Sequence, residues 1–374
     1  MTPPRLYLLA CLIIVLSIPV FGWDTTWSLL GIGSLEPGFA DLRSIQAGLG
    51  ADAHGINPQQ ANRGDPLGRP MNYPSVWLSI ARFLHWEIER NLLLSGAACG
   101  AMFAACCHHI ISRWPSWWAV PLCLFGAPAL MVERANNDSV VFVLVFLGAV
   151  SARGWFAVLL PAATLLKIFP VLALPAFARD RRLFVMAAAG CVAAGVFLLP
   201  QIPLIRSGTP ASLLLSYGLP VYVMGFAAAG VSVPPEAIGA ALLGLAILVS
   251  RRACQWLDAT DAAEDKVATR LFLAGTGLYI GTTLLGANWD YRACVLLMTI
   301  PFVGKLPSAR LRNTLIGLLA LALNQALIED VGGLPAVWLN LAAKASLFVL
   351  MGGLAIRIAP QALGLSRAPG PSPA

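Results

Sequence analysis

The sequence predicts an all-α protein, a single bundle of about 10–12 transmembrane helices over residues 1–374. The chain is 58% hydrophobic and 11% charged, and its mean hydropathy is +0.76. Soluble domains carry about 25% charged residues, so this chain is strongly depleted in charge. A soluble fold of this length could not bury so much apolar side chain, whereas lipid can solvate it. The apolar residues also form continuous runs, as membrane-spanning helices require.

Apolar runs between charged breaks give the expected spans. The first run follows Arg5 and is interpreted as an uncleaved helix, because no small-residue cleavage site follows it. Several runs are shorter than the roughly 20 residues that cross a bilayer, so some helices should cross obliquely or incompletely. The expected spans are 6–23, 91–112, 117–132, 139–151, 183–203, 236–250, 271–287, 291–304, 313–328 and 335–356.

Lysine and arginine residues indicate the orientation of these spans. With the N-terminus in the cytoplasm, the basic breaks at Arg113, 181–182, 251–252 and 310–312 all fall on the cytoplasmic side. The loop 24–90 then lies outside the cytoplasm, and loops of that length largely escape the rule. The formal charge of +7 therefore reflects orientation in a membrane and does not indicate nucleic-acid binding. Residues 366–374 read as a disordered tail.

Residues 155–178 do not fit this alternation, because basic residues flank the segment on both sides. Three prolines inside it would each disturb a helix. We predict a broken or re-entrant hairpin with Lys167 near its tip, since irregular backbone at membrane depth is tolerated where it lines a cavity. A single kinked span with an imperfect charge bias is the alternative.

The loop 24–90 holds the first group of candidate functional residues, among them Asp41, Arg43 and Asp52. Its last part, 75–90, has one apolar face that suits a helix lying in the membrane interface. A carboxylate there could be a general base for a hydroxyl acceptor, and an arginine could bind a phosphate bidentately. The alternative is a solvated loop whose charges only keep it soluble.

The second group is the hexapeptide ERANND, Glu133 to Asp138, between two short apolar runs. Asn and Asp favour turns and helix N-termini, so a plain turn is one interpretation. Lys167, Lys344 and the Asp290/Arg292 pair are the charges nearest to membrane depth. Such charges mark functional sites by default, although Lys344 could extend to the interface and the pair could cap a helix.

The run Cys106-Cys107-His108-His109 resembles a metal cluster only in composition. Adjacent residues of a helix point about 100° apart and do not converge on one ion. No metal-ligand spacing is found elsewhere, and a divalent cation is left as a possible cofactor.

Six segments occur in a distinctive order along much of the chain. They are FADLRSIQAG with Asp41, GAD with Asp52, NYPSVW with Asn72 and Tyr73, ERANND, LLKIFPVLALP with Lys167, and NWDYR with Asp290 and Arg292. In this order they resemble bacterial membrane glycosyltransferases of the C superfamily, especially the family 87-like polyprenol-phosphate-mannose-dependent mannosyltransferases. Such relatives usually have a glycine where this chain has Ala135, and often an aromatic residue in place of His54.

The resemblance implies a glycosyltransferase-C fold in the bacterial cytoplasmic (inner) membrane, with the active site on the extracytoplasmic side. It implies inverting transfer of a mannose-like hexose from a polyprenyl-phosphate donor to a lipid or glycan acceptor. Asp41 is the implied general base, with Asp52 as the next candidate. The implied phosphate-binding cations are Lys167, Arg134 and Arg292. Substrate-binding candidates are Arg43, Asn72, Tyr73, Asn136, Asn137 and Asp290.

Three other classes compete with this interpretation. A transporter or flippase would also have broken helices and charges at membrane depth, but it often shows an internal repeat, and none is evident here. A glycan polymerase would typically have its largest loop later in the chain. A non-enzymatic membrane scaffold would not need polar residues gathered on one side.

Overall fold

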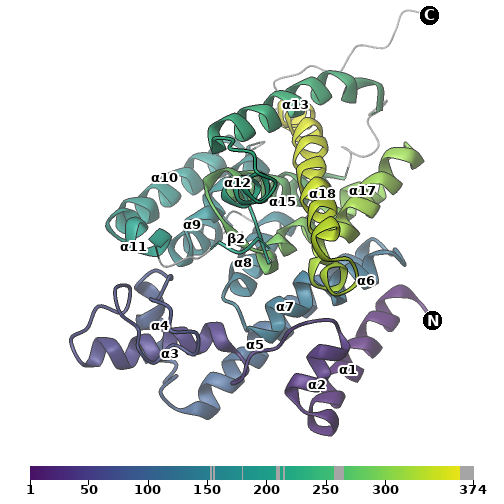
Figure 1. The fold of residues 1–374 in the computed structure, drawn as a ribbon. Coiled ribbons are helices and arrows are strands. Elements are labelled where there is room, and N and C mark those ends of the chain that lie inside the picture. Colours follow the sequence, from purple (N-terminus) through teal and green to yellow (C-terminus); the bar gives the residue numbers. More distant parts are fainter. Residues whose placement is uncertain are drawn as a thin grey trace, which may run out of the picture.

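The computed structural model describes residues 1–151, 154, 156–178, 180–207, 211–213, 215–256 and 265–362 (Figure 1). Most of these residues are helical and very few lie in strands, which confirms the all-α prediction. The first loop contains helices of its own. One antiparallel pair of two-residue strands, elsewhere in the chain, joins Ser216 to Trp289 and Tyr217 to Asn288. The elements up to the first broken helix are α1 Pro3–Phe21, α2 Trp23–Leu29, α3 Ala40–Ala53, α4 Val76–Phe83, α5 Glu89–Arg113, α6 Ala119–Leu124, α7 Ala127–Glu133, α8 Asp138–Val150 and α9 Phe156–Leu166.

The described chain beyond residue 168 contains three 3-10 helices, which are labelled η. Its elements are η1 Phe169–Phe177, α10 Arg181–Leu198, η2 Leu199–Gln201, α11 Ile202–Ser207, β1 Ser216–Tyr217, α12 Leu219–Ala228, α13 Pro235–Trp256, α15 Lys266–Leu285, β2 Asn288–Trp289, η3 Asp290–Thr299, α16 Ile300–Gly304, α17 Ala309–Leu323 and α18 Gln325–Ala362. Within α18, Gly333 has a φ of 56°, which marks a kink.

Four helical segments of the described residues are long and apolar enough to cross a membrane: 3–21, 89–113, 181–205 and 335–360. The expected spans 236–250 and 271–287 lie largely in the continuous helices α13 and α15, whereas several others are shorter or divided. The run 117–132 is split into α6 and α7 at Gly126, whose φ is 63°. The run 291–304 consists largely of the 3-10 helix η3, which rises about 2.0 Å per residue and so covers more length with fewer residues than an α-helix.

The helices have two chemically distinct ends. At the start of α5, Glu89 forms an ion pair with Arg43 of the first loop. At the other end of α5, Trp114 Nε1 donates to Asp265 Oδ2 over 3.0 Å, and Lys305 Nζ pairs with the same carboxylate over 2.5 Å. We call these the first-loop end and the Asp265 end. Residues that the sequence assigns to opposite sides of a membrane therefore lie at opposite ends of one helix.

The segment after α8 reaches the first-loop end and returns. Lys167 follows α9 and contacts Asp138 at the start of α8. The chain then runs back as η1, so that Phe177 packs on Gly148 near the end of α8. Leu172 of η1 packs closely against Gly277 and Gly281 of α15, which have no side chain to keep it away. The backbone thus turns at Lys167.

The first loop is docked on the bundle by its helices α3 and α4, which lie together in Figure 1. The backbone N–H groups of Phe39 and Asp41 donate to the carbonyls of Glu133 and Arg134 over 3.3 and 3.2 Å. Trp77 Nε1 of α4 donates to the Leu166 carbonyl over 3.0 Å. The helix expected over 75–90 is shorter and ends before His85, whose φ is 52°. Trp77 on one face is buried, whereas Phe83 at its end is exposed.

Candidate functional site

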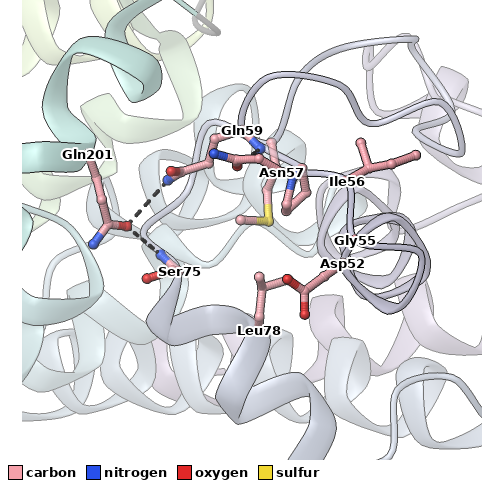
Figure 2. Close-up of a pocket in the computed structure, with 10 residues that line it drawn as sticks. Asp52, Gly55, Ile56, Asn57, Gln59, Ser75, Leu78 and Gln201 are labelled. Atoms are coloured by element: carbon pink, nitrogen blue, oxygen red, sulfur yellow. Dashed lines mark hydrogen bonds between the residues drawn. The ribbon is translucent and has the colours of Figure 1, made fainter.

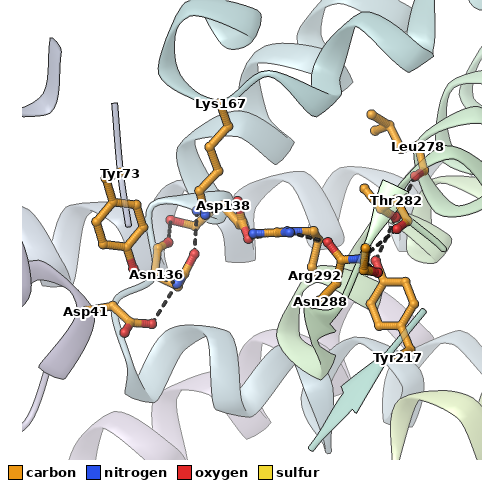
Figure 3. Close-up of polar contacts among 12 residues, drawn as sticks. Asp41, Tyr73, Asn136, Asp138, Lys167, Tyr217, Leu278, Thr282, Asn288 and Arg292 are labelled. Carbon is orange, nitrogen blue, oxygen red and sulfur yellow. Dashed lines mark hydrogen bonds and ion pairs between the residues drawn. The ribbon is translucent and has the colours of Figure 1, made fainter. Parts of the chain in front are cut away.

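Asp41 lies in the first turn of α3, at the contact between the first loop and the bundle (Figure 3). Its side chain is only 3% exposed. Asn136 Nδ2 donates to Asp41 Oδ2 over 2.6 Å, and Arg69 Nη2 lies 3.2 Å from Asp41 Oδ1. Phe39 directly precedes the helix with a left-handed φ of 63°, which turns the chain onto α7. The carboxylate is thereby fixed from two directions.

A second carboxylate shares the same guanidinium. Arg69 Nε lies 3.2 Å from Asp65 Oδ2, which also accepts the backbone N–H groups of Leu67 and Arg69. Two carboxylates and one guanidinium leave one net negative charge in this group. We call Asp41, Asp65 and Arg69 the acidic half of the site.

The basic half consists of Asp138, Lys167 and Arg292. Lys167 Nζ lies 2.6 Å from Asp138 Oδ1, and Arg292 Nε lies 3.0 Å from Asp138 Oδ2. The three side chains are at most 15% exposed, and two cations with one carboxylate leave one net positive charge. Buried charges persist only when they are paired and hydrogen-bonded in this way.

Three structural elements position the basic half. Asp138 is the first residue of α8, where the helix dipole favours a negative charge. Lys167 lies at the turn between α9 and η1. Arg292 is in the first turn of η3, where Asn288 Oδ1 accepts from its guanidinium and the Phe169 ring lies 4.7 Å from it.

Asn136 connects the two halves. Its Nδ2 donates to Asp41 and lies 3.4 Å from the Tyr73 hydroxyl, while its Oδ1 accepts the backbone N–H of Asp138 over 2.8 Å. Lys167 Nζ lies 5.0 Å from the centre of the Tyr73 ring. Burial, followed by the negative charge of Asp41, raises the pKa of Tyr73 well above its usual value, so its hydroxyl stays protonated. A carboxylate, a neutral phenol and two cations therefore meet at one buried place.

The backbone of the ERANND segment requires an unusual conformation at its centre. Ala135 has a φ of 44°, in the left-handed region that favours glycine. This turn brings Asn136 back toward α3, where it meets Asp41. The position where the resembling family usually has glycine is thus one where the backbone conformation itself favours glycine.

Five of the residues singled out in the sequence come together here: Asp41, Tyr73, Asn136, Lys167 and Arg292. Asn72 is partly buried next to Tyr73 in the chain. Asn137 is 1% exposed, and its side-chain amide has no hydrogen-bond partner among the described residues. It lies between two residues that belong to the site.

The other candidates lie apart from this group. Asp52 follows Asp41 by eleven residues on the same helix, about 16 Å along its axis, and pairs with the exposed Arg82. Arg43 pairs with Glu89. Arg134 pairs with Glu133 over 2.9 Å and donates to the Gly33 carbonyl over 3.1 Å. These two arginines hold the first loop in place.

Asp290 and Arg292 do not pair with each other. Asp290 Oδ1 lies 2.6 Å from Lys344 Nζ, and neither side chain is more than 6% exposed. The backbone N–H of Asp290 also donates to Leu215 over 2.9 Å. Asp290 and Lys344 are thus fixed beside the basic half and not within it.

Asp138, Arg69 and Asp65 lie in the polar segments that the sequence singled out, but no individual role was predicted for them. Asp138 is the last residue of ERANND. The available signal in the sequence was its position directly before an apolar run, in a chain with cations near membrane depth. Arg69 and Asp65 are two of several charged residues in the first loop, and no local pattern distinguishes them. Their pairing with each other and with Asp41 depends on the folded loop.

No group of three or more His, Cys, Asp or Glu side chains placed to hold a metal ion is found in the part of the chain that the structure describes. Comparison of the chain with protein-family models, with curated proteins and with solved structures gives no match.

Proposed function

We propose that the chain is a multi-pass membrane glycosyltransferase that moves a mannose-like hexose from a polyprenyl-phosphate donor to an extracytoplasmic acceptor hydroxyl. The observation that carries this proposal is the acidic half with Asp41, placed next to the basic half with Lys167 and Arg292. Transfer between a phosphate-linked sugar and a hydroxyl needs a proton acceptor and a stabilised phosphate leaving group. These two requirements correspond to the two halves.

In the proposed reaction, Asp41 accepts the proton of the acceptor hydroxyl. The acceptor oxygen forms a bond to the anomeric carbon, and the bond between that carbon and the phosphate oxygen breaks. The bonding electron pair leaves with the polyprenyl phosphate. Because the nucleophile enters opposite to the leaving group, the anomeric configuration is inverted.

Lys167 and Arg292 are the cations that would bind the phosphate. Asp138 holds both in place while leaving one net positive charge for an anion. Cations fixed in advance where charge develops lower the barrier without reorganisation during the reaction. An arginine can also bind two phosphate oxygens at once.

The experiment is transfer by purified protein in lipid nanodiscs, with a panel of radiolabelled polyprenyl-phosphate sugars and membrane-extracted acceptors. We expect Asp41→Asn to abolish transfer while expression and membrane insertion stay normal. The matched control is Asp180→Asn. Asp180 caps α10 at the Asp265 end, and asparagine caps helices about as well as aspartate.

Asp52→Asn distinguishes the two candidate bases. We expect it to retain most of the activity, because Asp52 lies far along α3 from the two cations. Wild-type transfer by Asp41→Asn together with loss of transfer by Asp52→Asn would reverse the assignment. An absence of transfer from every donor in the panel would contradict the proposed function.

A transporter or flippase is the second candidate, and one observation favours it. Lys344 and Asp290 form a fully enclosed ion pair between α18 and η3, the type of charge that transporters use near the membrane midplane. In proteoliposomes, a carrier would move a labelled lipid-linked sugar between leaflets without forming a glycosidic bond. Mild acid releases hexose from polyprenyl phosphate. A glycosyltransferase would form a product whose hexose is not released by this treatment.

A further inference from the structure

A cavity of about 420 Å³ lies between the first loop and the end of the α10–η2 segment (Figure 2). On one side, Gln201 Oε1 accepts the backbone N–H of Ser75 over 2.8 Å and faces Gln59 Nε2 over 3.3 Å. Asp52 and Ile56 lie on the opposite side in Figure 2. The cavity is within the size range of small-molecule sites and is too large for a single ion or water.

The chemistry of the walls selects a neutral, hydroxyl-rich ligand. The described lining residues include the amides Asn57, Gln59 and Gln201 and no lysine or arginine. The one carboxylate, Asp52, already pairs with Arg82. An anion would find no lysine or arginine among these lining residues, and a lipid tail would form no hydrogen bond with their amides. Amides that donate and accept next to apolar side chains match the hydroxyl groups and C–H faces of a sugar.

The position of the cavity relative to Asp41 follows from α3. A Cβ at Gly48 would lie 2.9 Å from Met71 Sδ and 3.3 Å from Leu78 Cδ2, and both of these side chains line the cavity. Gly48 is seven residues after Asp41, about 10 Å along the helix, and Asp52 is about 16 Å away. A ligand in the cavity therefore lies farther from the proposed base than one hexose unit reaches.

We propose that this cavity binds a non-reacting hexose unit of an extended oligosaccharide acceptor, at some distance from the hydroxyl that accepts the new sugar. This inference rests on the proposed function and adds a substrate class to it: a glycan of several units. The first loop then serves two purposes, since α3 carries the base at its start and a wall of the glycan subsite at its end.

A blocking substitution tests the subsite without disturbing the core. Ile56 lines the cavity and is 41% exposed, so Ile56→Trp should fill the cavity while the protein folds normally. Leu84→Trp is the matched control, because Leu84 is 39% exposed and is not one of the lining residues. Acceptors that carry the same lipid and either one hexose or a linear chain of several are compared under saturating donor.

We expect the wild-type protein and Leu84→Trp to have a lower KM for the longer acceptor. In Ile56→Trp, the KM for the longer acceptor should rise about tenfold, which corresponds to about 1.4 kcal/mol of binding free energy. The kcat for the single-hexose acceptor should not change. Equal KM values for both acceptors in the wild type, or equal behaviour of the two tryptophan variants, would overturn the proposal.

A binding measurement separates this proposal from the function on which it rests. Free manno-oligosaccharides and mannose are titrated into the purified protein by calorimetry, without donor. Binding of the oligosaccharides to the wild type and to Leu84→Trp, lost in Ile56→Trp, supports the subsite even if no transfer is observed. Transfer activity without any oligosaccharide binding would leave the proposed function standing and refute the subsite.

Discussion

Replacing Asp138 by asparagine removes the one carboxylate that, among the described residues, pairs with both cations of the basic half. The substitution keeps the shape of the side chain, so the loss is one of charge. Lys167 and Arg292 would then face each other with one more net positive charge than before, in a place where none of the three side chains is more than 15% exposed. Removing one partner of a buried ion pair costs about 3–5 kcal/mol.

The described cysteines offer a direct assay of this loss. A dye that fluoresces on reaction with thiols reports unfolding, because most of the described cysteines are buried in the folded protein; these are Cys99, Cys106, Cys107, Cys123, Cys191 and Cys294. The entropy of unfolding is about 2.1 cal/mol/K per residue, so for a chain of 374 residues a loss of about 3–5 kcal/mol corresponds to a fall in Tm of about 4–6 °C for Asp138→Asn. Asp180→Asn should unfold at the wild-type temperature.

A second variant tests the physical cause. In Asp138→Asn/Lys167→Met the net positive charge returns to the original value, because one cation is removed together with the carboxylate. We expect this double variant to recover part of the lost Tm, although transfer activity stays low. A wild-type Tm for Asp138→Asn, or losses in the double variant that simply add, would refute electrostatic coupling within the basic half.

Three further predictions concern the segments that position the site. Ala135→Gly should raise the Tm by an amount equivalent to about 1 kcal/mol, because glycine adopts a φ of 44° without strain; an unchanged or lower Tm would contradict this. Gly96→Ala should lower transfer activity, because its Cβ would lie 2.5 Å from the Phe39 ring that precedes the α3 helix; activity equal to wild type would show that the ring has room to move. Partial burial raises the pKa of Asp265, but hydrogen bonds from Lys305 and the α15 N-terminus outweigh it and hold the pKa well below its usual value. The stabilisation from Asp265 is therefore present above the usual carboxylate pKa and is lost as the pH falls through the lowered value, so the Tm difference between wild type and Asp265→Asn should shrink in acid.

The sequence predicted those features that depend on local chemistry. The continuous apolar runs between charged breaks predicted helices, and the described residues confirm the all-α class. The basic flanks and the prolines of 155–178 predicted a break with Lys167 near its tip, and in the structure α9 ends at Leu166 and η1 begins at Phe169. The ERANND segment stood out because five polar residues within six positions of an apolar stretch are costly unless they are used.

The partners of each charge could not be predicted, because they depend on contacts between distant segments. Asp290 and Arg292 are two residues apart, yet one pairs with Lys344 and the other with Asp138. In the 3-10 helix η3, successive side chains are spaced differently from those of the α-helix expected there. Arg69 lies in an irregular loop, where no periodicity indicates that it faces Asp41.

The separation of charge between the two halves is itself an argument for transfer chemistry. If Asp41 paired directly with Lys167, their charges would cancel, and neither a departing proton nor a developing phosphate charge would be stabilised. Instead the neutral Asn136 and Tyr73 lie between the halves, and the burial of Tyr73 keeps it protonated. Two unit charges 4 Å apart interact by about 4 kcal/mol at an effective dielectric constant of 20. The proposed reaction delivers a proton to the half with excess negative charge and an anion to the half with excess positive charge, so each half stabilises the charge that the transition state creates beside it.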